Sequence, residues 1–202
     1  MMSDINASDA SHLTISEEQM MKPVIQEDLK KLSVALPDSH KGQNGRLLVI
    51  GGSHLFHAAS LWSLTVASRI VDLVHYCSVP ENNEIVQKAK EEFRNGIVVH
   101  RADVESYVDE DDVILMGPGM TRDIETENLT NALLKKYPQK QWVLDAGALQ
   151  MMDISLIPNN AILTPHHGEF EHAFGAELRS EQIFFDPLLA STDTPQSSVV
   201  TK

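Results

Sequence analysis

Titratable side chains follow an apolar run in the segment AILTPHHGEF, residues 161–170. Pro165 should end this run as a buried strand, because proline cannot donate to a central ladder. His166, His167 and Glu169 are then expected at the carboxyl end of that strand, the edge where open α/β sheets bind ligands. Imidazole and carboxylate groups at such an edge could bind a metal ion, transfer a proton or hydrogen-bond to a substrate.

The surroundings of this cluster favour a polar contact with a substrate over a metal site. Adjacent residues in an extended chain point in opposite directions, so His166 and His167 would not face one ion together. No further His, Cys, Asp or Glu with the spacing of a metal site lies nearby in the sequence. We therefore predict that these side chains form no metal site.

Three further clusters follow predicted strands, and parallel strands would bring all four clusters to one crevice. Glycines there would let a ligand approach the backbone, and the following helix offers unpaired N–H groups to a polar or anionic group. Taken singly, each glycine pair could equally serve a tight turn. The candidate pocket residues are Glu169 and, after the other strands, Gly51, Gly52 and Ser53, then Gly117 with Pro118 and Gly119, then Asp145 with Ala146 and Gly147.

Two other features leave alternatives open. Asp145 could hold a ribose or a water molecule that takes part in catalysis, or it could cap the next helical turn. His40 and Lys41, in SHKGQNG before the first strand, could reach the same crevice or belong to a solvated loop.

The hydrophobic pattern predicts strands that alternate with helices, which is typical of βαβ units and a mainly parallel sheet. The strands read as nearly continuous apolar runs, which indicates a three-layer α/β fold with helices on both faces of the sheet. Strands are expected at residues 46–50, 73–79, 97–99, 113–116, 142–144 and 161–164. Helices are expected at residues 58–71, 83–94 and 124–136, with a short helical turn at 149–152.

One α/β domain is predicted over residues 25–190, because 202 residues suffice for one such domain with tails. Residues 1–24 read as a flexible N-terminal segment, and the Ser/Thr-rich residues 191–202 as a disordered tail. A helix is expected within residues 25–36, where Leu29, Leu32 and Leu36 recur at helical spacing.

The charge balance argues against nucleic acid and membrane surfaces as partners. Lys and Arg number 16 against 29 Asp and Glu, so the net charge is −13 and a phosphate backbone would be repelled. No run approaches the ~18 apolar residues of a membrane span, and no signal peptide is recognised, so a cytoplasmic location is expected. The single cysteine, Cys77, lies in an apolar run and is expected to be a buried structural thiol.

Two nucleotide-binding fingerprints are absent from the sequence. Gly51 and Gly52 are adjacent, with no third glycine before the predicted helix, so the GxGxxG pattern of a dinucleotide-binding Rossmann fold is not met. A GxxxxGKS/T loop does not occur either. A hydride-transferring Rossmann enzyme is therefore disfavoured.

Four segments in register carry a resemblance to a known family: HKGQNGRLLVIGGS, VILMGPGM, VLDAGAL and ILTPHHGEF. They closely resemble the ADP/ATP-dependent NAD(P)H-hydrate dehydratases, a carbohydrate-kinase-like family related to ribokinase. The resemblance covers about residues 38–175 and implies a ribokinase-like fold.

The resemblance implies an enzyme that repairs NADH or NADPH hydrated at the nicotinamide ring. ADP or ATP would be the co-substrate, with Mg²⁺, and the hydroxyl of the hydrate would be phosphorylated and then eliminated. By their positions in the family's motifs, Ala59, Gly119 and His166 would contact the hydrated cofactor, and Gly117 would shape the same turn. Asp145 and Glu169 match characteristic family positions. The implied partners are small-molecule nucleotides and further copies of the chain in a homo-oligomer.

The sequence departs from the family pattern mainly after Gly175. The family continues to a glycine-rich Gly-Thr/Ser-Gly-Asp loop that forms an anion hole for the phosphates and carries the catalytic aspartate, whereas residues 176–202 contain no glycine. The resemblance therefore predicts a fold that is truncated at the C-terminus and a 202-residue chain with little dehydratase activity. Around Ala59 the family's Gly-Ala-Pro reads Ala-Ala-Ser, and His167 replaces a proline.

Two other functions fit the same motifs. One is a related small-molecule kinase that acts on an alcohol substrate, since the architecture is shared. The other is a non-catalytic nucleotide-binding or subunit-interaction module that has the substrate side of the crevice and not the phosphate side.

Overall fold

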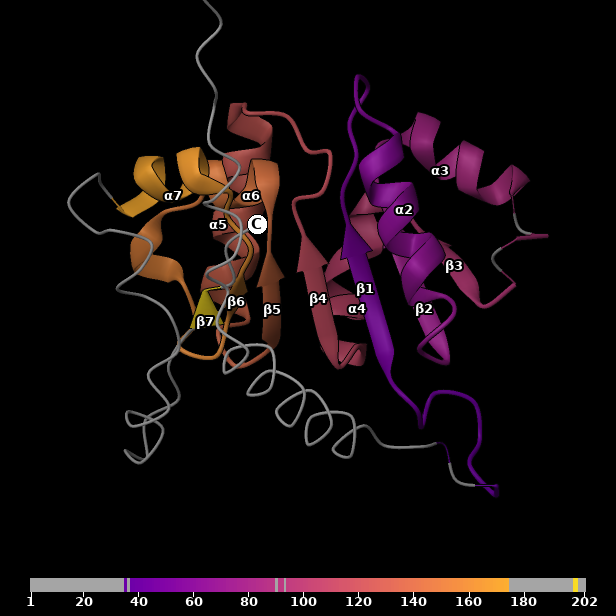
Figure 1. Ribbon diagram of the computed structural model, residues 1–202. Coiled ribbons are helices and arrows are strands. Elements are labelled where there is room, and N and C mark those ends of the chain that lie inside the picture. The colour runs from indigo at the N-terminus through magenta and orange to yellow at the C-terminus, as the bar shows by residue number, and fades with distance from the viewer. Residues whose placement is uncertain (1–34, 36, 90, 93, 175–197, 200–202) are drawn as a thin grey trace, which may run out of the picture. The chain divides into compact units, whose positions relative to one another are not determined.

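The computed structural model describes residues 35, 37–89, 91–92, 94–174 and 198–199. The chain divides into two compact units, Met1–Ser39 and His40–Lys202. Within the described part of the second unit, seven strands form one sheet in the order β3-β2-β1-β4-β5-β6-β7, and every pair is parallel (Figure 1). The prediction of a parallel α/β fold is therefore confirmed.

Strands and helices alternate along the chain almost as the hydrophobic pattern predicts. The elements are β1 (Arg46–Ile50), α2 (Ala58–Ala67), β2 (Leu73–Cys77), α3 (Pro80–Lys88), β3 (Gly96–Val99), η1 (Arg101–Asp103), α4 (Val104–Glu110), β4 (Val113–Met116), α5 (Ile124–Lys136), β5 (Gln141–Leu144), α6 (Ala146–Met151), η2 (Ile154–Leu156), β6 (Ile162–Leu163), α7 (His167–Phe174) and β7 (Ser198–Val199).

Two expectations at the chain ends fall mostly beyond this part of the chain. The helix expected within residues 25–36 and the flexible segment 1–24 lie outside the described residues. Of residues 191–202, expected to be disordered, the structure describes only Ser198–Val199, which pairs with β6 as strand β7. Within the described ranges, no helix is both long and apolar enough to cross a membrane.

Helices cover both faces of the sheet around β1, because its side chains alternate between two cores. Leu48 and Ile50 belong to a core that includes buried residues of α4, α5 and α6. Val49 belongs to a second core, formed with Leu64 of α2 and Val86 of α3. Figure 1 shows α2 and α4 on opposite sides of the sheet, so the three-layer prediction is confirmed here.

The second face is covered less completely over β4, β5 and β6. Leu115, Val143 and Ile162 are neighbours in the strand register, on the face opposite to Met116 and Leu144. The latter two are fully buried, whereas the row of three is only partly buried. The prediction that both faces are covered thus holds for β1–β3 and is met in part for β4–β6.

Helix α2 ends at Ala67, earlier than the predicted residue 71, because a distant side chain binds the carbonyl groups beyond it. The side-chain amide of Asn95, just before β3, donates to the carbonyl oxygens of Ser68 and Val71 at 2.9 and 3.1 Å. These bonds satisfy acceptors that further helical turns would otherwise satisfy.

Helix α3 spans Pro80–Lys88 rather than the predicted residues 83–94. Proline is favoured in the first helical turn, where its missing N–H would have no intrahelical partner. Asn83 is buried: its side chain accepts from Ser78 N–H at 3.1 Å and donates to Val99 O at 3.3 Å. This amide ties the start of α3 to the ends of β2 and β3.

Three shorter elements differ from the prediction. The helical turn expected at 149–152 is α6, which begins directly after Asp145. Helices α4 and α7 were not indicated by the apolar pattern, because each is short.

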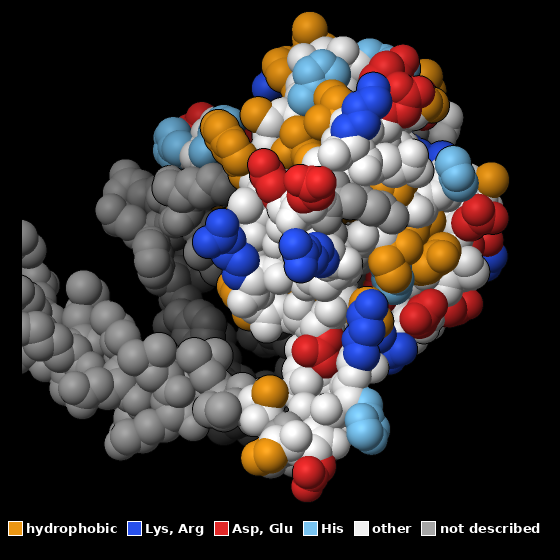
Figure 2. Space-filling view, turned by 90° about the vertical axis from the view of Figure 1, so that its right-hand side faces the viewer, with side chains coloured by type: hydrophobic (Ala, Val, Ile, Leu, Met, Phe, Trp, Pro, Cys, Tyr) orange, Lys and Arg blue, Asp and Glu red, His pale blue; other side chains and the backbone are white. Residues whose placement is uncertain are grey.

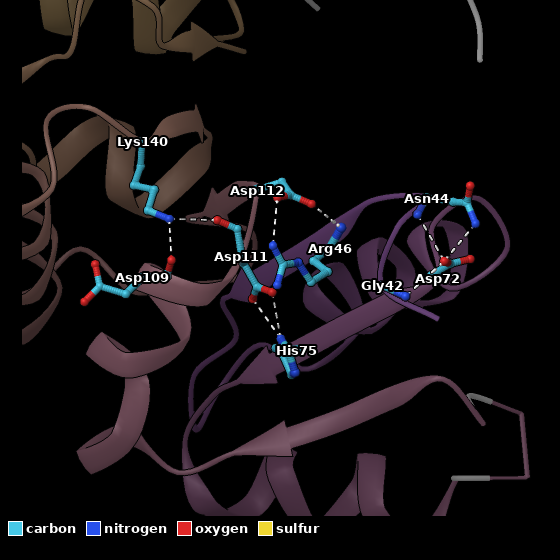
Figure 3. A network of polar contacts seen from close by, with 9 residues as sticks. All are labelled: Gly42, Asn44, Arg46, Asp72, His75, Asp109, Asp111, Asp112 and Lys140. Carbon is cyan, nitrogen blue, oxygen red and sulfur yellow. Dashed lines mark hydrogen bonds and ion pairs between the residues drawn. The ribbon is translucent and has the colours of Figure 1, made fainter. Parts of the chain in front are cut away.

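Polar side chains hold the loop before β1 at the amino edge of the sheet, where the strands begin (Figure 3). Asp72, just before β2, accepts hydrogen bonds from the N–H groups of Gly42 and Asn44, both at 3.1 Å. These bonds, that from Asn44 most strongly, lower the pKa of the Asp72 carboxyl group. His40 and Lys41 in the same loop are exposed, so they belong to a solvated loop and not to the crevice at the opposite edge.

A buried histidine–carboxylate pair lies in the same region (Figure 3). His75 of β2 and Asp111, which precedes β4, are 2% and 1% exposed. Nδ1 of His75 lies 2.9 and 2.8 Å from the two carboxylate oxygens of Asp111. Lys140 donates from Nζ to the carbonyl oxygens of Asp109 and Asp111 at 2.6 and 3.0 Å, which joins the start of β5 to this pair.

Replacing Asp111 with alanine should lower the free energy of unfolding by about 3 kcal/mol, because it leaves the buried His75 without its partner. Asp109→Ala is the matched control, since Asp109 is exposed and only its backbone oxygen takes part in the network. We expect the control to change stability by no more than about 0.5 kcal/mol. Urea unfolding followed by circular dichroism measures both, and equal midpoints for the two variants would show that the buried pair contributes little.

Candidate functional site

All four predicted clusters lie at the carboxyl edge of the sheet, because the strands that precede them run parallel. Neighbouring loops are hydrogen-bonded to one another: Gly52 N–H donates to Pro118 O at 2.7 Å, and Asp145 N–H donates to Met116 O at 3.0 Å. The four loops that hold these clusters are residues 51–53, 117–119, 145–147 and 164–169, and together they are called the carboxyl-edge loops.

Glycine is required where these loops touch. Gly117 has φ +123°, and a Cβ atom there would lie 1.7 Å from the carbonyl oxygen of Asp145. Gly119 has φ +75°, and its Cβ would lie 3.3 Å from the Cα of Gly52. Backbone atoms therefore pack directly against backbone atoms. Gly117 and Pro118 are buried by these contacts, and Gly119 is partly exposed.

Ala59 lies in the first turn of α2, which polar contacts hold beside loop 51–53. Ser53 N–H donates to Phe56 O, and Phe56 N–H donates to the hydroxyl oxygen of Ser53, both at 3.0 Å. His57, just before α2, is hydrogen-bonded to the side chain of Asn82. Asn82 in turn donates to Ser53 O at 3.3 Å, so α3 helps to position the start of α2.

His166 and Glu169 form the start of α7 together. Nδ1 of His166 accepts from the backbone N–H groups of Gly168 and Glu169, at 3.1 and 3.3 Å. In return, a carboxylate oxygen of Glu169 accepts from the backbone N–H of His166 at 2.9 Å. This is the reciprocal pattern of a capping box, with histidine in place of serine or threonine.

The cap fixes the orientation of the imidazole ring of His166. Since Nδ1 accepts, the hydrogen bonds assign the proton of the neutral ring to Nε2. Nε2 lies 3.5 Å from Oε1 of Glu169, and the His166 side chain is 56% exposed. Glu169 itself is buried, and Gln150 of α6 donates to its Oε1 at 2.7 Å. The exposed imidazole of His166 is thus held at the carboxyl edge by the backbone of α7 and by buried Glu169.

Asp145 precedes α6 but does not cap it through its side chain. Its Oδ1 accepts a hydrogen bond from the hydroxyl of Thr164 at 2.9 Å. Of the alternatives considered for Asp145, the helix cap is therefore wrong, and the carboxylate instead joins two carboxyl-edge loops.

Two groups near this edge have shifted pKa values. Burial raises the pKa of the Cys77 thiol to about 11, and the positive charge of Arg101 opposes that rise. Cys77 is buried and unpaired, as the sequence predicts for a structural thiol. Asp123, before α5, has a lowered pKa because its carboxylate accepts hydrogen bonds, above all from the hydroxyl of Thr121.

A family model described as NAD(P)H-hydrate dehydratase, of the carbohydrate kinase group, matches residues 47–185, more than half of the chain. The chain belongs to this family. The resemblance stated on four sequence segments is therefore confirmed.

Curated proteins and solved structures of the family are similar to this chain. A bifunctional NAD(P)H-hydrate repair enzyme of Methanocaldococcus jannaschii is 35% identical over 158 residues, 72% of this chain and 31% of that protein. An ADP-dependent (S)-NAD(P)H-hydrate dehydratase of Lactiplantibacillus plantarum is 27% identical over 168 residues, 80% of this chain and 60% of that protein.

The solved structures support the fold. An ADP/ATP-dependent NAD(P)H-hydrate dehydratase of Bacillus subtilis, co-crystallised with ATP and Mg²⁺, superposes with a TM-score of 0.63 at 23% identity. The superposition covers 85% of this chain and 62% of that one. A ribokinase-like protein of Enterococcus faecalis gives a TM-score of 0.66 at 21% identity, over 85% of this chain and 62% of that one. The ribokinase-like fold is thus confirmed.

All four carboxyl-edge loops fall within the residues that the dehydratase family model matches. Sequence reasoning placed their glycines, His166 and Glu169 at one edge, and the structure brings them there. It missed Asn82 and Gln150, whose amides support Ser53 and Glu169 from helices elsewhere in the chain. The spacing His-x-x-Glu before Phe170 was the one local signal for the cap of α7.

Replacing Gly117 with alanine should destabilise this member of the family by about 3 kcal/mol or more, because the new Cβ would overlap the Asp145 carbonyl and φ is positive. Gly168→Ala is the control: its Cβ would lie 3.2 Å from the end of the His166 side chain, in the first turn of a helix. We expect the control to stay within about 1 kcal/mol of the parent. Thermal unfolding by calorimetry measures both, and a Gly117→Ala protein as stable as the control would contradict the close approach.

Proposed function

We propose that the carboxyl edge of this chain binds a reduced nicotinamide dinucleotide hydrated at its ring, and that the chain acts in nucleotide-dependent dehydration of that compound. The observation that carries the proposal is the presence of Gly119 and the capped His166 at one edge, inside the residues that the family model matches. The chain spans about a third of the bifunctional archaeal relative and 46% to 60% of the shorter dehydratases that it resembles.

The proposed contacts follow from the geometry of the loops. Gly119 is partly exposed and has no side chain, so the nicotinamide end would approach its backbone closely, and Ala59 at the start of α2 is also partly exposed. His166 would donate from Nε2 to the hydroxyl of the hydrate or to a phosphate oxygen. Since buried Glu169 holds the imidazole ring of His166, we propose that His166 positions the substrate. It does not carry out the dehydration itself.

The family also implies ADP or ATP and Mg²⁺ at the reaction centre. Among the described residues, no group of three or more His, Cys, Asp or Glu side chains is arranged to hold a metal ion. Mg²⁺ is usually bound through one or two carboxylates together with nucleotide phosphates, so it would enter with the nucleotide.

A second function has one observation in its favour. Residues 176–202 contain no glycine, so the 202 residues include no Gly-Thr/Ser-Gly-Asp segment. A chain that binds the hydrated cofactor without turning it over would be a nucleotide-binding module. Binding of the hydrate without dehydration is the alternative to the proposed function.

The test compares two adjacent histidines. His166→Asn keeps a good helix cap but removes the Nε2 donor, and it should weaken binding of hydrated NADH about 10-fold. His167→Asn is the matched control, because His167 is 75% exposed, pairs with Glu171 and takes no part in the cap. Isothermal titration of each protein with hydrated NADH and with hydrated NADPH gives the affinities.

Equal affinity of the two variants would contradict the role given to His166. Absence of saturable binding by the parent chain would contradict the proposed function. In parallel, recovery of the absorbance of NADH in the presence of ADP or ATP measures turnover. Rapid recovery by the 202-residue chain would show that it is a complete dehydratase and would remove the binding-only alternative.

A further inference from the structure

A small pocket of about 50 Å³ lies at the carboxyl edge beside the candidate site. Its lining includes Gly52 and Ser53 after β1, Met120 after β4, and Arg101 just after β3. Since a Cβ on Gly119 would lie 3.3 Å from Gly52, the pocket adjoins the loop proposed to meet the nicotinamide end of the substrate. The pocket is too small for a base or a nicotinamide ring, so only the sugar–phosphate part of a nucleotide is compact enough to enter it.

Arg101 is the cation of this pocket. It is half-buried in η1, and its side chain forms no hydrogen bond or ion pair with another residue that the structure describes. Its charge acts at the end of β2, where it opposes the raised pKa of Cys77. An arginine in this position has all of its guanidinium donors available for an anionic ligand group.

The distribution of charge makes Arg101 unusual in this chain. With a net charge of −13, the protein would repel a phosphorylated ligand unless a cation lies at the binding edge. Among the described lysines and arginines, only Arg101 and Arg122 lie in segments between the end of a strand and the next α-helix, and so toward the carboxyl edge. The others precede or begin strands, or lie at the ends of helices, toward the amino edge, and are Lys41, Arg46, Arg69, Lys88, Arg94, Lys135, Lys136 and Lys140.

The surface seen from the β3 side has mixed charge. In Figure 2, Lys and Arg side chains lie close to Asp and Glu side chains over the whole face, and neither sign of charge covers it. General electrostatic attraction would therefore not hold an anion here, so a specific contact is needed.

Two carboxylates also line the pocket and restrict the ligand further. Asp123 accepts from Thr126 N–H at 2.9 Å and from the hydroxyl of Thr121, and the carboxylate of Glu125 lies nearby. A free phosphate ion would be attracted by Arg101 but repelled by these two carboxylates. A phosphate carried on a ribose suits the pocket better, because ribose hydroxyls donate hydrogen bonds to carboxylates.

We propose that Arg101 and its pocket are the ribose phosphate subsite for the dinucleotide substrate. Arg101 pairs with a phosphate while Asp123 accepts from a ribose hydroxyl, so the nicotinamide end reaches the loop of Gly119. The dinucleotide identity of this ligand rests on the proposed function, whereas the affinity of the pocket for a ribose phosphate does not.

The experiment compares reduced nicotinamide mononucleotide, which has one phosphate, with reduced nicotinamide riboside, which has none. Arg101→Gln should weaken binding of the mononucleotide about 10-fold and leave binding of the riboside unchanged, as measured by isothermal titration. Arg101→Lys should restore part of the affinity, because it retains the charge and loses the forked geometry. Raising the salt concentration should weaken mononucleotide binding more for the parent than for Arg101→Gln.

Arg122→Gln is the matched control, because Arg122 is exposed, lies at the same edge and does not line the pocket. An equal loss of affinity in Arg122→Gln would show a general charge effect and overturn the subsite. Unchanged mononucleotide affinity in Arg101→Gln, with an unchanged melting temperature, would overturn it as well.

A fragment probe separates this inference from the proposed function. Ribose 5-phosphate should shift the side-chain Nε–H resonance of Arg101 in the parent protein, and it should bind more tightly than inorganic phosphate. If it does so while no hydrated dinucleotide binds, the subsite stands and the proposed function fails. If hydrated NADH binds but neither the fragment nor Arg101→Gln has an effect, the proposed function stands and the subsite fails.

Discussion

The close approach of backbone atoms between neighbouring strand-end loops is the constraint on which the candidate site depends. Gly52 N–H lies 2.7 Å from Pro118 O, and no side chain fits between Gly117 and the Asp145 carbonyl. Because these contacts are made by backbone, the loops have fixed positions relative to the sheet without filling the edge with side chains. That leaves peptide groups and a few polar side chains, among them His166, to meet a ligand.

The polar groups at the two edges of the sheet differ in what they bind. At the amino edge, His75 and Asp111 form a buried pair, and Lys140 and Asp72 tie loops to the strands. Lys140 binds backbone carbonyl groups and Asp72 binds backbone N–H groups, and most of the described lysines and arginines lie toward this side. The carboxyl edge keeps Arg101 without a protein partner among the described residues, so its charge remains available to a ligand of opposite sign.

Much of the fold could be predicted because strands in a covered parallel sheet are short apolar runs, and 46–50 and 113–116 match the structure residue for residue. Helix ends were less predictable. The end of α2 depends on Asn95, and the start of α3 on a proline and a buried asparagine. In each case a side-chain hydrogen bond decides where the helix begins or ends, and neither the hydrophobic pattern nor helix propensity indicates that bond.

The sequence by itself determined the family, the order of strands along the chain and the strand ends at which His166, Glu169 and the glycines lie. Local composition suffices for these features, since apolar runs and turn residues act over a few neighbouring positions. Only the tertiary structure decided that His166 caps α7 through Nδ1, that Gln150 holds Glu169, and that Arg101 shares a pocket with Gly52. The last two contacts join segments far apart in the chain, because the parallel sheet brings its carboxyl ends to one edge. The cap of α7 is local, but it depends on the side-chain conformation of His166.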